Sequence, residues 1–79
     1  ILAFAIYPNP SDDYLNINFV SNATEINMQI TDYSGRVIKT ECLINYENKI
    51  DVSSLSSGIY FVKLIDSKQN IQTIKFVKN

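Results

Sequence analysis

Apolar and polar residues alternate in short runs along most of the chain, and this alternation predicts β-strands. Residues 14–20 are the clearest case, because Leu15, Ile17 and Phe19 alternate with polar residues. Successive side chains of a strand point to opposite faces, so the apolar residues belong in a core and the asparagines at the surface. Residues 25–31 repeat the pattern. No segment has the longer apolar period of a helix.

Turn signals recur about every ten residues and divide this pattern into separate strands. Pro8 and Pro10 end the first strand, because proline has no backbone N–H to donate to a sheet. Asp32 and Gly35 mark a hairpin loop, where the aspartate can accept bonds from backbone amides and the glycine can adopt a positive φ. The predicted strands are residues 3–7, 14–20, 25–31, 36–44, 46–52, 59–66 and 71–78. Their spacing predicts a seven-stranded antiparallel immunoglobulin-like β-sandwich.

Alternation within the later strands predicts which side chains face the core. The expected inner residues are Ile26, Met28, Ile30, Ile50, Val52, Tyr60, Val62, Leu64, Ile74 and Phe76, with Leu55 at one end of the core. Residues 36–44 are ambiguous because both faces contain apolar groups. We prefer Ile38, Thr40, Cys42 and Ile44 inside, over Val37, Lys39, Glu41 and Leu43. Ile59, Phe61 and Ile65 on the second face of their strand predict that it is covered on both sides or lies centrally in its sheet.

Length and charge limit the possible functions. The chain has 79 residues, which predicts one small domain spanning residues 1–79. Because it begins without methionine, we expect it to be a fragment of a larger protein. The net charge of −1 argues against nucleic acid as a partner. No apolar run approaches the roughly 20 residues of a membrane span, so membrane insertion is not predicted.

The charges are unevenly distributed. Residues 63–79 contain one acidic residue, Asp66, and four lysines: Lys63, Lys68, Lys75 and Lys78. The ordinary explanation is that lysines on exposed strands discourage edge-to-edge pairing. The alternative is that an acidic partner contacts this cationic end.

Residues capable of chemistry are few. Histidine is absent and Cys42, expected to be a small buried side chain, is the only cysteine, so we predict no enzyme, disulfide, metal site or cofactor. Three weaker readings remain open. Possible calcium ligands are Asp12, Asp13 and Asp51. The N-glycosylation triplet is matched by Asn22-Ala23-Thr24. Possible sugar-binding rings are Tyr7, Tyr14, Tyr33 and Tyr46, although each more simply packs at the edge of the core.

An ordered set of motifs resembles a known family. The motifs are Tyr7-Pro8-Asn9-Pro10, Leu15-Asn16-Ile17, Asp32-Tyr33-Ser34-Gly35-Arg36-Val37, the segment from Ile50 to Val62 that contains Gly58-Ile59-Tyr60, and Lys75-Phe76-Val77-Lys78. In order and spacing they resemble the type A C-terminal sorting domain of the type IX (Por) secretion system of Bacteroidota. The resemblance covers essentially the whole chain.

This resemblance implies a non-catalytic sorting signal. Such domains end larger cargo proteins that pass through the periplasm and are directed across the outer membrane to the cell surface or the medium. The implied partners are translocon components, a sortase-like surface cysteine protease and N-terminal cargo domains. By position, the expected recognition residues are Gly58, Tyr60, Lys75, Phe76, Val77 and Lys78. We expect Gly58 and Tyr60 to serve folding, and the lysines to contact a partner directly.

Two other functions are consistent with the residues alone. An adhesive or carbohydrate-binding immunoglobulin-like module would place several aromatic rings on one face. A structural cap on a neighbouring domain would show a large apolar patch around Ile59, Phe61 and Ile65.

Overall fold

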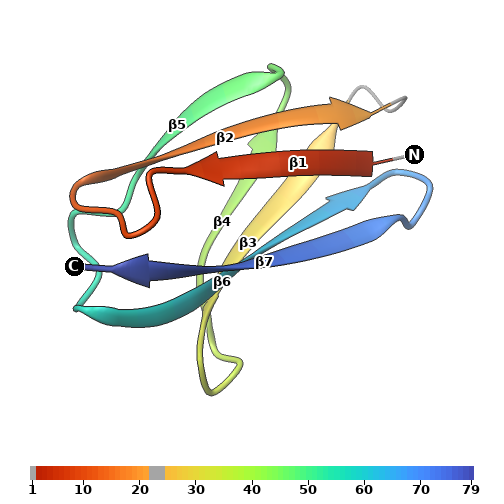
Figure 1. The fold of residues 1–79 in the computed structure, drawn as a ribbon. Coiled ribbons are helices and arrows are strands. Elements are labelled where there is room, and N and C mark those ends of the chain that lie inside the picture. Colours follow the sequence, from red (N-terminus) through yellow and green to blue (C-terminus); the bar gives the residue numbers. More distant parts are fainter. Residues whose placement is uncertain (1, 22–24) are drawn as a thin grey trace.

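The protein is all-β in the parts that the structure describes. A computed structural model describes residues 2–21 and 25–79. Its strands are β1 (Leu2–Tyr7), β2 (Tyr14–Ser21), β3 (Ile26–Asp32), β4 (Val37–Leu43), β5 (Glu47–Asp51), β6 (Gly58–Asp66) and β7 (Ile71–Lys78) (Figure 1). The seven predicted strands are therefore confirmed, with boundaries that differ by a few residues.

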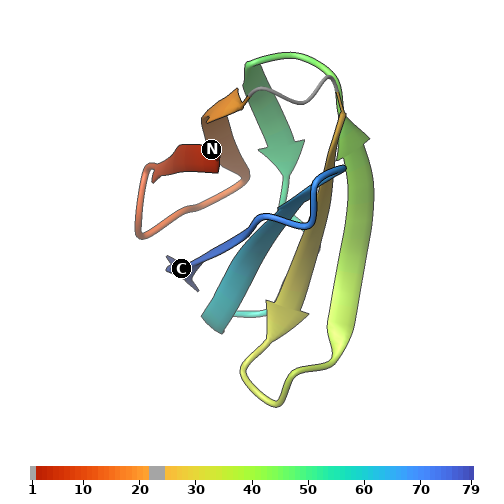
Figure 2. The same ribbon diagram turned by 90° about the vertical axis from the view of Figure 1, so that its right-hand side faces the viewer.

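The strands form two antiparallel sheets. One has the order β1-β2-β5 and the other the order β4-β3-β6-β7. The view in Figure 2 shows the two sheets as separate layers. Strand β7 is an edge strand of the larger sheet, and its neighbour β6 lies between β7 and β3. This arrangement confirms the central position predicted for residues 59–66.

A single core joins the two sheets. It contains Leu15, Ile17, Phe19 and Ile50 from the smaller sheet and Ile26, Met28, Ile30, Leu43, Tyr60, Val62, Leu64 and Phe76 from the larger one, together with Val52. Leu55 packs against this cluster, as expected. The clean alternation of β2, β3 and β6 predicted these faces correctly, because each of these strands has one consistently apolar face.

The predicted facing of β4 is wrong. Leu43 is buried opposite Ile26, whereas the four residues preferred for the core, Ile38, Thr40, Cys42 and Ile44, are exposed. The register shifts between Ile30 and Thr31, so that Lys39 and Val37 pair with these two residues and Ile38 lies in between. A bulge of this kind interrupts the two-residue period, and one face cannot be followed through it. Cys42 lies outside this bulge and pairs with Asn27, an exposed residue of β3, so it lies on the surface and not in the core.

Strand β6 has one buried face and one partly exposed face. Tyr60, Val62 and Leu64 enter the core. On the opposite face Ile59 is 46% exposed, and Phe61 and Ile65 are half-buried. Strand β6 is therefore central in its sheet, and its outer face is partly open to solvent although it contains apolar residues.

Candidate functional site

Strands β6 and β7 bring all six predicted recognition residues together. The paired positions are Gly58–Lys78, Ile59–Val77, Tyr60–Phe76 and Phe61–Lys75. The Gly-Ile-Tyr-Phe and Lys-Phe-Val-Lys motifs, which are separated in the sequence, therefore form one two-stranded block. We call it the β6–β7 block, residues 58–61 and 75–78.

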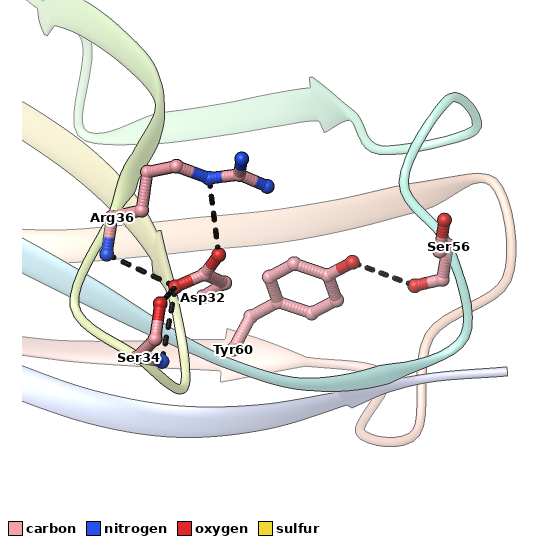
Figure 3. A network of polar contacts seen from close by, with 5 residues as sticks. All are labelled: Asp32, Ser34, Arg36, Ser56 and Tyr60. Atoms are coloured by element: carbon pink, nitrogen blue, oxygen red, sulfur yellow. Dashed lines mark hydrogen bonds and ion pairs between the residues drawn. The ribbon is translucent and has the colours of Figure 1, made fainter.

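Two aromatic residues hold this block to the core. The rings of Tyr60 and Phe76 are stacked, with centroids 5.5 Å apart and planes 24° apart. Phe76 is fully buried and Tyr60 nearly so. The Tyr60 hydroxyl donates a hydrogen bond of 2.7 Å to the backbone carbonyl of Ser56, in the turn that precedes β6 (Figure 3). The packing role predicted for Tyr60 is confirmed, and both rings hold the two strands against the core.

Gly58 begins β6 with a backbone conformation that favours glycine. Its φ is +153°, and no heavy atom lies within 4 Å of the position that a Cβ would occupy. The constraint at this position is therefore conformational and not steric. This agrees with the expectation that Gly58 serves the entry of the chain into the strand.

The two closing lysines lie on opposite faces, which corrects one expectation. Lys75 is exposed on the outer face of the sheet. Lys78 is only 9% exposed, and its Nζ donates a hydrogen bond of 3.1 Å to the backbone oxygen of Asn79. An odd separation along a strand puts two side chains on opposite faces. Lys75 is therefore free to contact a partner, whereas Lys78 is a largely buried residue at the edge of the core.

The segment between the two prolines covers part of the outer edge of β7, which the sequence did not predict. The Asn9 side chain accepts a bond from Val77 N (2.9 Å) and donates one to Lys75 O (3.1 Å). The buried Ser11 continues this contact through its backbone: its N–H donates to Val77 O, and its carbonyl accepts from Asn79 N, both at 2.8 Å. An amide side chain can substitute for a paired strand here because it has both a donor and an acceptor.

Three strands end at an aspartate whose side chain caps the turn that follows. Asp32 Oδ1 accepts bonds from the Ser34 hydroxyl and from the backbone N–H groups of Ser34 and Arg36, and Arg36 Nε lies 3.3 Å from Asp32 Oδ2 (Figure 3). The hydrogen bond from the Ser34 hydroxyl is the main cause of a lowered pKa for Asp32. The predicted capping role of Asp32 is confirmed.

Asp51 and Asp66 follow the same rule. The Ser53 side chain lowers the pKa of Asp51, and the Asn70 side chain lowers the pKa of Asp66. Asp66 is nearly buried and accepts three bonds of 2.9 Å, from the backbone N–H groups of Lys68 and Asn70 and from the Asn70 amide. These carboxylates accept the hydrogen bonds that hold the turns after β5 and β6.

Comparison with protein families now identifies the chain. Residues 5–79 match the family model of the secretion system C-terminal sorting domain, Por_Secre_tail. The chain belongs to this family. It is a C-terminal sorting signal of type IX secretion, which directs proteins to the cell surface or the extracellular space. The resemblance inferred from the ordered motifs is thereby confirmed.

The fold is similar to that of a solved structure. This structure is of PorZ, described as an essential bacterial surface component of the type-IX secretion system of Porphyromonas gingivalis. Its matching part is 24% identical to this chain, with a TM-score of 0.80. The similarity covers 96% of the sorting domain and 11% of the PorZ chain. No curated protein matches.

Other chemical readings find little support in the sorting domain. The described residues contain no group of three or more histidine, cysteine, aspartate or glutamate side chains placed to hold a metal ion. Among them, too, no helix has the length and apolar character needed to cross a membrane. The Asn22-Ala23-Thr24 triplet lies outside the described residues.

The four tyrosines considered for sugar binding have separate local roles. Tyr46 packs edge-on against Phe19, with ring centroids 5.8 Å apart, and Tyr14 lies under the Lys49 ammonium group at 4.2 Å. Tyr7 ends β1 and accepts a bond from Asn18 through its hydroxyl, while Tyr33 lies in the β3–β4 loop. The carbohydrate-binding alternative is therefore not favoured.

Proposed function

We propose that residues 1–79 form the C-terminal, non-catalytic domain of a larger secreted protein and adopt an immunoglobulin-like β-sandwich. The shared core of the two sheets and the similarity to a PorZ domain support this arrangement. The attached cargo passes through the periplasm before it crosses the outer membrane. A translocon component then recognises the folded domain, and a sortase-like surface cysteine protease cleaves it, after which the cargo is released or attached to the surface.

One observation supports recognition at the β6–β7 block more than any other. The pairing of β6 with β7 assembles both family motifs, keeps Tyr60 and Phe76 inside, and leaves Lys75 exposed beside the half-buried Val77. In this proposal Gly58, Tyr60, Phe76 and Lys78 shape the block, and Lys75 and Val77 contact the translocon. Surface charges mainly direct association and select the partner, so loss of one lysine has a modest effect.

The test is export of a reporter. A fluorescent protein carrying an N-terminal signal peptide is fused to residues 1–79 and expressed in a type IX-competent bacterium and in a strain that lacks the translocon. We expect surface or medium fluorescence only in the competent strain. The same reporter without residues 1–79 is the control and should remain periplasmic. Equal retention of both reporters in the periplasm would exclude the sorting function for this chain.

A further inference from the structure

The outer face of the β6–β7 pair combines apolar side chains with lysines. The alternation of β6 directs Ile59, Phe61 and Lys63 away from the core, and the alternation of β7 does the same for Lys75 and Val77. Ile59 pairs with Val77 and Phe61 with Lys75, so these residues form a continuous surface. We call it the outer stripe, which consists of these five residues.

Protection of a sheet edge does not account for Lys63. Lysine on an edge strand prevents pairing with other chains, which accounts for Lys75 on β7. Lys63 lies on β6, which is paired on both sides and needs no such protection. Its position opposite Thr73 makes it a diagonal neighbour of Lys75, which pairs with Phe61. Diagonal neighbours lie about 7–8 Å apart, within reach of long side chains, so the two ammonium groups make this part of the outer face cationic.

No carboxylate of the described residues compensates these lysines. The positions of β3 that pair with Phe61, Lys63 and Ile65 are Thr31, Gln29 and Asn27, all uncharged. The salt bridges among the described residues are Arg36–Asp32 and Lys39–Glu41, and neither contains Lys63 or Lys75. The outer stripe is therefore cationic and partly apolar, with Ile59 46% exposed.

We propose that the outer stripe binds an acidic protein segment of the export machinery, in which carboxylates face Lys63 and Lys75 and apolar side chains cover Ile59, Phe61 and Val77. A protein partner fits this surface better than an anionic lipid or glycan, because headgroups and sugars would pair with the lysines and leave the apolar row uncovered. The proposal rests on the sorting function and adds Ile59, Phe61 and Lys63 to the residues that serve it.

Charge reversal in the reporter fusion tests the proposal. Lys63→Glu should lower surface fluorescence by about tenfold, because it replaces attraction with repulsion, and Lys63→Gln should lower it less. The matched control is Lys68→Glu, which makes the same charge change in the β6–β7 turn; it should remain within about twofold of the parent fusion. Protease resistance of the periplasmic fraction shows whether each variant is folded. The reporter replaces the natural cargo, so any effect cannot come from contact with a cargo domain.

A photo-crosslinker identifies the partner class. Placed at position 59, it should form an adduct with a type IX component that Lys63→Glu abolishes; at position 20, on the exposed Val20 of the smaller sheet, it should not. Co-sedimentation with phosphatidylglycerol vesicles should be the same for the parent domain and for Lys63→Glu. Adducts with lipopolysaccharide, or vesicle binding that depends on Lys63, would show that the outer stripe binds a membrane and not a protein.

The outcomes separate the two proposals. If the parent fusion is exported and folded Lys63→Glu is exported equally well, the outer stripe is not a binding surface and the sorting function stands. If the parent fusion is itself retained, the sorting function fails. Lys63→Gln distinguishes loss of an attractive lysine from repulsion by the new carboxylate. A defect confined to Lys63→Glu still indicates an acidic partner at this position, whereas full export of both variants counts against the stripe.

Discussion

Individual side chains in the β6–β7 block have different tasks even where they belong to the same motif. Tyr60 and Phe76 face inward and stack, whereas Lys75 lies on the surface. The family motif alone does not distinguish these tasks, because a residue can recur either for folding or for recognition. Burial distinguishes the side chains that pack in the core from those that a partner could reach.

The Tyr60 hydroxyl is expected to stabilise the turn before β6. Tyr60→Phe removes its bond to Ser56 O and keeps the ring stacked on Phe76. We expect the free energy of unfolding to fall by about 1 kcal/mol, the usual net value of such a bond. Urea unfolding measures this change. Tyr33→Phe, on a ring that is 82% exposed, is the control and should be neutral; an equal loss in both variants would contradict the assignment.

Cys42 is expected to react in the native protein. It is exposed on β4, so a maleimide should label it at a rate within about tenfold of the rate in denaturant. Cys42→Ser should change the free energy of unfolding by less than about 0.5 kcal/mol. If Cys42 is labelled only after unfolding, Cys42 is buried, as the sequence suggested, and the observed register of β4 is contradicted.

The turns between strands and the edge of the larger sheet depend on side-chain hydrogen bonds. Asp32, Asp51 and Asp66 end β3, β5 and β6, and each caps the residues that follow. Asn9 and Ser11 cover the edge of β7. The strands themselves follow from alternation, but their ends and edges require these particular polar groups.

The capping aspartates make stability sensitive to acid. Their pKa values in the folded state are lowered, so their contribution is fully present above the unfolded value of about 3.9 and is lost as the pH falls below it. Urea unfolding at pH 7 and pH 3 should therefore give a lower stability at pH 3. Asp66→Asn should be less stable at pH 7 and should lose less on acidification. A pH dependence unchanged by this substitution would show that Asp66 does not contribute.

Asn9 is expected to protect the edge of β7. Asn9→Ala removes the bonds to Lys75 O and Val77 N, which water can partly replace, so we expect a loss of about 1–2 kcal/mol in the free energy of unfolding. The uncovered edge should also pair with a second copy, which sedimentation at increasing concentration would detect. Asn16→Ala, which removes an exposed bond to Tyr7 O, is the control and should stay monomeric.

The whole molecule depends on its last strand. Phe76 is fully buried between the sheets, and residues 77–79 bond to Asn9 and Ser11 near the start of the chain. Shortening the chain would therefore disrupt folding as well as the recognition proposed for the β6–β7 block. Point variants on the outer face, such as Lys63→Glu, change the surface and leave the core intact.

A chain lacking residues 75–79 is expected to unfold. Loss of a buried phenylalanine costs about 3–5 kcal/mol of the roughly 4–12 kcal/mol available to a domain of this length, and the truncation also removes the pairing of residues 75–78 with β6. Circular dichroism and thermal unfolding should show no cooperative transition for the truncated chain and a clear one for Lys75→Glu. A stable truncated domain would show that β7 is dispensable for folding.

The sequence alone determined the strands, the inner faces of β2, β3 and β6, and the family. Each of these depends on local alternation or on the order of motifs, which can be read along the chain. Only the tertiary structure decided the facing of β4, the burial of Lys78 and the role of Asn9. The facing of β4 follows from its pairing with β3, with a bulge opposite Ile30 and Thr31, and the bonds of Asn9 join residues 66 and 68 positions apart. Contacts at that separation leave no periodic pattern in the sequence, because they depend on which strands become neighbours when the sheets form.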